Sequence, residues 1–200
     1  LELLDVPGEW FFDHESASNT VYYMPRDGRD PNDLNIRMKT QPYAILCSGD
    51  DGVVVEGFDY FATTFRLDDC DGSEIRNSTL FYPSTSKRSL GYAGEDMDNR
   101  YVSRVDDCIG CLVDRCDFLY TDGAAFEAHG GASSSQNNTI NNSYFYHIDW
   151  SGSDQKSLMT TIMMDGTTNR FTNNTMHKTG TSATIRIGNA PQIMFNEIYD

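Results

Sequence analysis

The chain has 200 residues, a length that suits one domain and buries a sizeable core. It carries 30 acidic against 15 basic residues, a formal net charge of −15 that excludes nucleic acid and anionic membranes, because both need clustered Lys and Arg. No apolar run approaches the roughly 20 residues that cross a bilayer, so no membrane insertion is expected.

The first elements differ from the rest of the chain. Residues 5–13 and 19–25 predict two strands joined by a polar turn, and residues 26–33 predict a turn-rich loop. Buried strands are expected again at Tyr43–Leu46 and Val53–Val55. We therefore divide the chain into an entry segment, 1–42, and a repetitive region, 43–200.

A repeat follows. Residues 66–80 and 104–118 match at an Arg, an Asp-Asp-Cys run, a Gly and several apolar positions, with an offset of 38 residues. A shorter pattern recurs at spacings of 38, 27, 31 and 22 residues. It consists of an apolar residue, then a small residue or Asn, then a second apolar residue. Its central residues are Ser78, Cys116, Ser143, Asn174 and Asn196.

These spacings favour an all-β solenoid. Tetratricopeptide repeats need about 34 residues, and the regular Leu positions of leucine-rich repeats are absent. A parallel β-helix remains, in which the small residues and Asn stack at a sharp inward turn. Three longer coils carry extra residues at Pro83–Arg100, Ala132–Gln136 and Asp149–Leu158, which we expect to project from one side.

A second strand recurs in each coil, at 126–130, 162–166 and 185–189. Alternation places Glu127, Met163 and Arg186 in one outward row and His129 and Asp165 side by side in the next. A slip of one residue in the register would reverse these faces.

The entry segment and the coils together resemble secreted right-handed parallel β-helix proteins of the pectate-lyase superfamily. The resemblance rests on Pro7-Gly8-Glu9-Trp10, on Val21-Tyr22-Tyr23 and on the Asn-bearing coils, and it covers about residues 4–200. It implies the fold and a polysaccharide as partner, but members include lyases, hydrolases, epimerases and noncatalytic surface proteins.

A glycoside hydrolase needs two carboxylates that flank the scissile bond. The candidates on the expected face are Glu127, Asp149 and Asp165, with His129 beside them and with Trp150, Lys156 and Arg186 as substrate-binding residues. Tyr146 is a further aromatic candidate for the sugar platform, with packing beneath its own loop as the alternative.

A lyase is the alternative enzyme. It needs a base such as Lys156 or His129 and a cation, Arg186 or calcium held by acidic residues, to neutralise a uronate. The net charge disfavours a polyanionic substrate, so hydrolysis is preferred. The acidic pairs 68–69 and 106–107 are expected to face solvent or to cap turns.

A noncatalytic structural or adhesive module of a glycosylated surface protein or fibre is the third interpretation. Four sequons, at Asn77, Asn137, Asn141 and Asn173, are compatible with an extracellular or cell-surface protein. The chain ends inside a repeat, so we expect further coils or self-association there. The five cysteines are expected to be buried apolar residues rather than ligands of a zinc ion. A disulfide between Cys70 and Cys108 is the alternative for that pair.

Overall fold

The computed structural model describes residues 4–13, 18, 20–38, 41–84, 101–121, 123–148, 160–180 and 183–200. The chain divides into two compact units, Leu1–Met38 and Lys39–Asp200. In the first unit, β1 (Trp10–Asp13) and β2 (Thr20–Tyr23) pair antiparallel, which confirms the predicted strand pair. A 3-10 helix, η1 (Pro31–Asp33), follows in the expected loop.

The second unit consists of three parallel sheets of six strands each. Sheet 1 contains β3 (Tyr43–Ser48), β6 (Thr64–Asp68), β9 (Ser103–Asp106), β12 (Phe126–His129), β15 (Thr160–Thr167) and β18 (Ala183–Asn189). Sheet 2 contains β4 (Val54–Glu56), β7 (Glu74–Arg76), β10 (Leu112–Asp114), β13 (Thr139–Asn141), β16 (Arg170–Thr172) and β19 (Gln192–Met194). Sheet 3 contains β5 (Asp59–Phe61), β8 (Thr79–Phe81), β11 (Asp117–Thr121), β14 (Tyr144–Ile148), β17 (Thr175–Thr179) and β20 (Glu197–Tyr199).

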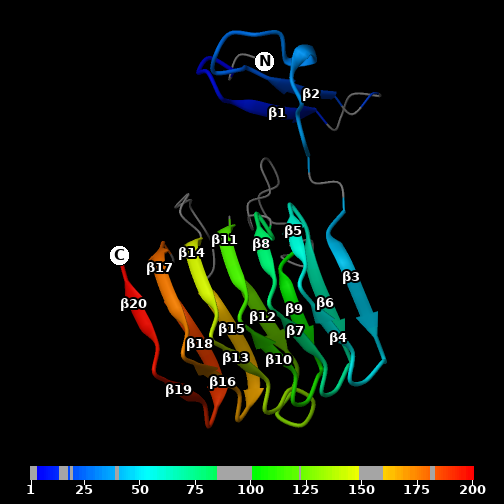
Figure 1. The fold of residues 1–200 in the computed structure, drawn as a ribbon, viewed down its shortest axis with the longest axis vertical. Coiled ribbons are helices and arrows are strands. Elements are labelled where there is room, and N and C mark those ends of the chain that lie inside the picture. Colours follow the sequence, from blue (N-terminus) through cyan, green and yellow to red (C-terminus); the bar gives the residue numbers. More distant parts are fainter. Residues whose placement is uncertain are drawn as a thin grey trace. The chain divides into compact units, whose positions relative to one another are not determined.

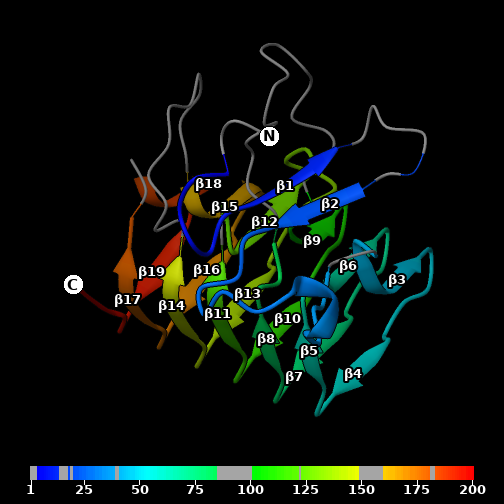
Figure 2. The same ribbon diagram turned by 90° about the horizontal axis from the view of Figure 1, so that it is seen from above.

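This unit is a right-handed parallel β-helix, as predicted (Figure 1). Each coil adds one strand to every sheet, so that strands far apart in the sequence lie side by side (Figure 2). The register confirms the repeat, because its first apolar residues stack in the order Ile75, Val113, Ile140, Phe171 and Ile193. The structure adds an earlier coil at β4 and β5, which the repeat pattern did not include.

The corner between sheets 2 and 3 has two residues in every coil. The first has a positive φ in all six coils, a conformation that Gly and Asn tolerate best, and Asn occupies it three times. The second is Phe58 in the first coil and the inward residue of the repeat in the others. Where it is Ser or Asn, its side chain accepts a hydrogen bond from the backbone of the preceding coil, as when Asn174 accepts from the Ser143 N–H at 2.8 Å and Asn196 from the Asn174 N–H at 2.9 Å.

The core lies between the sheets and is built from one aromatic or aliphatic layer per coil. The rings of Phe118 and Phe145 stack at 4.8 Å, and Phe171 follows at 5.8 Å. Cys70 and Cys108 are ladder neighbours as expected, since the Cys70 N–H donates to the Cys108 thiol at 3.2 Å. All five cysteines are free thiols, and four of them are buried.

The insertions do not share one position in the coil. Residues 132–136 connect sheet 1 to sheet 2, whereas in chain order the other two insertions separate a strand of sheet 3 from a strand of sheet 1, which corrects the expectation of a single side. Residues 85–100 and 149–158 lie outside the described residues. Sequence spacing alone could not distinguish the two corners, because both separate one strand pattern from the next. No helix in the described part of the chain has the length and hydropathy of a membrane span.

Candidate functional site

The outer face of sheet 1 carries the predicted site residues in the predicted register. Glu127 pairs with Met163 and Met163 with Arg186 on consecutive strands. His129 and Asp165 lie on neighbouring coils with 3.4 Å between His129 Nδ1 and Asp165 Oδ2. The faces of these strands are therefore those that alternation predicted, with Ala128 and Met164 turned into the core.

His129 lies between two carboxylates of different exposure. Its Nε2 is 2.9 Å from Glu127 Oε2. The Glu127 side chain is fully buried, the His129 side chain is 26% exposed and the Asp165 side chain is 39% exposed. Only the imidazole and Asp165 are thus open to a solute, while Glu127 holds the ring from within.

Hydrogen bonds to its backbone carbonyl hold Asp165 in place. Its carbonyl oxygen accepts from Ser135 Oγ at 3.1 Å and from Asn169 Nδ2 at 2.6 Å. The next residue, Gly166, has a φ of +93°, and a Cβ there would lie 1.9 Å from the Ser135 carbonyl oxygen. No other residue fits this close approach of two coils. Asp165-Gly166 therefore lies within strand β15 and holds the carboxylate beside His129.

Two arginines extend the same face toward the N-terminal coils. Arg66 pairs with Arg104 in register, and both bind Asp106, with Arg66 Nε at 2.8 Å and Arg104 Nη2 at 3.2 Å from its carboxylate. Asp106 pairs with His129 across β9 and β12. Sequence analysis missed these arginines as site neighbours, although each lies two residues before the strand-end Asp, as Glu127 lies two before His129.

The acidic pairs divide between two environments, which corrects the expectation for them. Asp106 is buried and paired, and Asp68 binds Arg66 at 3.0 Å, so both first members belong to the strand. Asp69 and Asp107 have positive φ and occupy the turn. The prediction is wrong for Asp106, because the guanidiniums of Arg66 and Arg104 cover its carboxylate, whereas the Asp68 side chain is 35% exposed.

Tyrosines lie near the two arginines. The rings of Tyr43 and Tyr101 meet edge to face at 5.9 Å. Burial raises the pKa of Tyr43, and the guanidiniums of Arg104 and Arg66 partly oppose this rise. The phenol of Tyr43 therefore stays protonated at neutral pH and serves as a hydrogen-bonding group.

None of the remaining predicted residues contacts His129 in the described part of the chain. Arg186 is exposed, with Nη1 4.0 Å from Met163 Sδ. Tyr146 belongs to sheet 3, so it is not an aromatic platform for the sheet 1 residues. Asp149, Trp150 and Lys156 lie outside the described residues.

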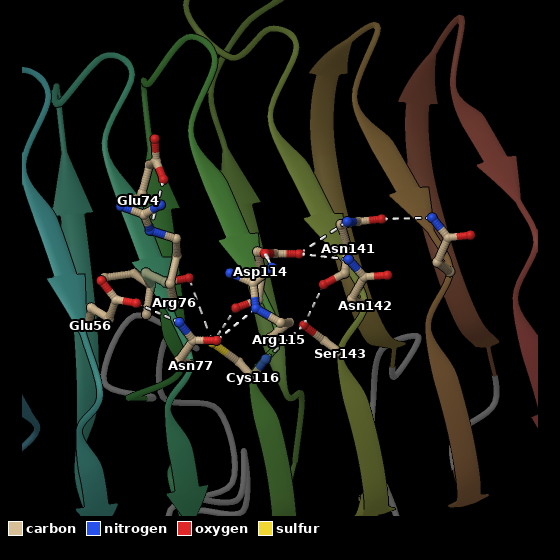
Figure 3. A network of polar contacts seen from close by, with 12 residues as sticks. Glu56, Glu74, Arg76, Asn77, Asp114, Arg115, Cys116, Asn141, Asn142 and Ser143 are labelled. Atoms are coloured by element: carbon tan, nitrogen blue, oxygen red, sulfur yellow. Dashed lines mark hydrogen bonds and ion pairs between the residues drawn. The ribbon is translucent and has the colours of Figure 1, made fainter.

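Three of the four sequon asparagines take part in hydrogen bonds at the corner between sheets 2 and 3 (Figure 3). Asn77 Nδ2 donates to Glu56 and its oxygen accepts from Arg115 Nε at 2.7 Å. Asn141 Nδ2 donates to Asp114 at 3.0 Å, and Asn173 donates to Asn141 at 2.9 Å. A glycan on any of these nitrogens would compete with such a bond, whereas Asn137 is an exposed turn residue.

No family model, curated protein or solved structure matches this chain. Within the described residues, no group of three or more His, Cys, Asp or Glu side chains is arranged to hold a metal ion. A partly exposed imidazole held between a buried and a partly exposed carboxylate is an arrangement suited to general acid–base chemistry.

Proposed function

We propose that this chain is an extracellular carbohydrate-active β-helix protein, related to the pectate-lyase superfamily, that hydrolyses a glycosidic bond in a polysaccharide. The observation that carries the proposal is the alignment of Glu127, His129 and Asp165 on the outer face of sheet 1. The outward row of sheet 1 runs along the stacked coils, and its partly exposed members, His129 and Asp165, lie side by side on it, an arrangement that suits an extended polymer.

In this proposal His129 and Asp165 are the catalytic residues and Glu127 is a positioning residue. His129 removes a proton from the attacking water while Asp165 orients that water, and the buried Glu127 stabilises the imidazolium that forms. The bond from the anomeric carbon to the leaving oxygen breaks, and a second carboxylic acid protonates that oxygen. Asp149 is the candidate for this acid.

Elimination is the second candidate, and a specific observation favours it. Arg66, Arg104 and Arg186 lie on the same outer face as His129. In a lyase, His129 removes the proton α to a uronate carboxylate whose charge a guanidinium neutralises. The bond to the leaving oxygen breaks as a carbon–carbon double bond forms, and the imidazolium or water gives that oxygen a proton. The products differ, since hydrolysis leaves saturated sugars and elimination leaves an unsaturated end that absorbs ultraviolet light.

The test is turnover of a panel of neutral and uronate-containing polysaccharides by the native chain and by His129→Ala, Asp165→Asn and Glu127→Gln. We expect His129→Ala and Asp165→Asn to lose activity about 100-fold or more, the usual contribution of a general base. Glu127→Gln should retain binding and alter the pH profile of turnover. The matched control is Asp68→Asn, a carboxylate in the same outward row.

New reducing ends without ultraviolet absorbance support hydrolysis, and absorbance supports elimination instead. Native turnover by both His129→Ala and Asp165→Asn would overturn the site. If the native chain binds a polymer and cleaves none, the adhesive interpretation replaces the enzyme.

A further inference from the structure

Sheet 3 has an aromatic outer face that the proposed reaction does not use. Its rings touch from one coil to the next in an unbroken series, from Phe61 to Tyr82 at 5.9 Å and from Tyr82 to Tyr120 at 5.8 Å. The series continues to Tyr146 at 5.4 Å, to His177 at 5.1 Å and to Tyr199 at 4.6 Å. We call this set, with Phe81, the aromatic strip.

The strip is exposed toward both ends and half-buried at Tyr120, Tyr146 and His177. Phe61 is 52% exposed, Tyr82 is 49% exposed and Tyr199 is 50% exposed. It crosses all six strands of sheet 3, a distance of about 24 Å at the usual spacing between strands. Polar residues could occupy the outward positions of these strands, so a continuous line of exposed and half-buried rings indicates a ligand.

Polar side chains run alongside the rings. The neighbouring outward row contains Asp59, Thr79, Asp117, Tyr144, Thr175 and Glu197 in register. Three of these are acids, and the Nζ of Lys178 lies 5.7 Å from the centre of the Tyr146 ring. Hydroxyl and carboxylate groups beside rings suit a ligand with many hydroxyl groups, and the acids repel a polyanion.

We propose that the aromatic strip binds a neutral polysaccharide chain that lies across the coils of sheet 3. A pyranose ring presents C–H groups on its faces and hydroxyl groups around its edge. The C–H groups fit the electron-rich faces of aromatic rings, and the hydroxyl groups fit the adjacent polar row. The coil spacing offers a new ring at about each sugar residue along an extended chain.

This inference rests on the proposed function in taking a polysaccharide as the ligand, and it deepens that function by naming a neutral polymer and a second surface. Sheet 3 and sheet 1 are different faces of the same coil, so the strip holds the polymer without contacting His129. Such a surface keeps the protein on an insoluble or long substrate between cleavage events.

The experiment measures binding of neutral and uronate-containing soluble polysaccharides by affinity electrophoresis and calorimetry. The strip variant is Phe81→Thr with Tyr82→Asn, since Thr suits the strand and Asn tolerates the positive φ of position 82. The control is Phe11→Ser, which removes an exposed ring from the first unit. His129→Ala is measured in parallel.

We expect the native chain, Phe11→Ser and His129→Ala to bind a neutral polymer with equal affinity, and the strip variant to bind at least about tenfold more weakly. Equal binding by the strip variant, or preference for the polyanion, overturns the proposal. A native dimer by light scattering that the strip variant converts to monomer would assign the strip to a second copy instead. Failure of the proposed reaction is separate, because it appears as native turnover by His129→Ala.

Discussion

At the scale of single residues, the thiols show how burial controls reactivity. Cys116 is completely buried, and burial raises its pKa to about 11. Burial also raises the pKa of Cys47, although that residue is only partly buried. Since the thiolate is the reactive form, the folded chain keeps these residues inert at neutral pH. The sequence analysis predicted that the cysteines are buried apolar residues, and four of the five are buried.

We therefore predict that iodoacetamide at pH 8 leaves Cys70, Cys108, Cys111 and Cys116 unmodified in the folded chain. Only Cys47 should react, and slowly, because the others lie in the core. Intact-mass measurement after labelling gives the count, and Cys47→Ser is the control that should take up no label. After denaturation without a reductant all five should react, and a count of three would reveal a disulfide instead.

At the scale of elements, local sequence predicted the inward turns better than the outer faces. Asn174 and Asn196 were recognisable because a turn with positive φ followed by a side chain that bonds the backbone needs few residue types. The outer face of sheet 3 was not recognised, because Phe81, Tyr146 and Tyr199 fall in one row only after the coils stack. Their spacing in sequence varies with insertions elsewhere.

The turn ladder makes a prediction for stability. Asn174→Ala removes the acceptor of the Ser143 N–H and the donor to the Ile140 carbonyl, both in the interior. Two buried backbone groups without partners cost about 2 to 5 kcal/mol of unfolding free energy. Thr175→Ala, one residue further on the outer face, should cost under about 1 kcal/mol. Urea denaturation measures both, and similar losses would contradict the role of the ladder.

At the scale of the whole molecule, the repeat spacing determined the architecture because every coil must return to the same register. Ile75, Val113 and Ile140 meet in sheet 2 although 38 and 27 residues separate them. Stability in such a solenoid is a sum over neighbouring coils rather than over one closed core. The excess of acids over bases acts on all coils together, as mutual repulsion at low ionic strength.

We predict that raising the salt concentration from about 0.02 M to 0.5 M raises the melting temperature by about 2 to 5 °C, because screening weakens this repulsion. Differential scanning calorimetry measures the shift. The variant Asp59→Asn with Glu197→Gln should reduce it, since two exposed acids of sheet 3 lose their charge. A melting temperature that falls with salt would mean that ion pairs such as Arg66–Asp106 outweigh the repulsion.

The constant two-residue corner between sheets 2 and 3 has a consequence for engineering. The connection from sheet 3 to sheet 1 varies from residues 62–63 in one coil to residues 82–102 in the next, yet the strands on both sides keep their pairing. The connection between sheets 2 and 3 is therefore constant in length, whereas the connection between sheets 3 and 1 tolerates insertions. Foreign peptides inserted between β17 and β18 should be displayed without loss of the scaffold, whereas one added residue at 173–174 should disrupt it.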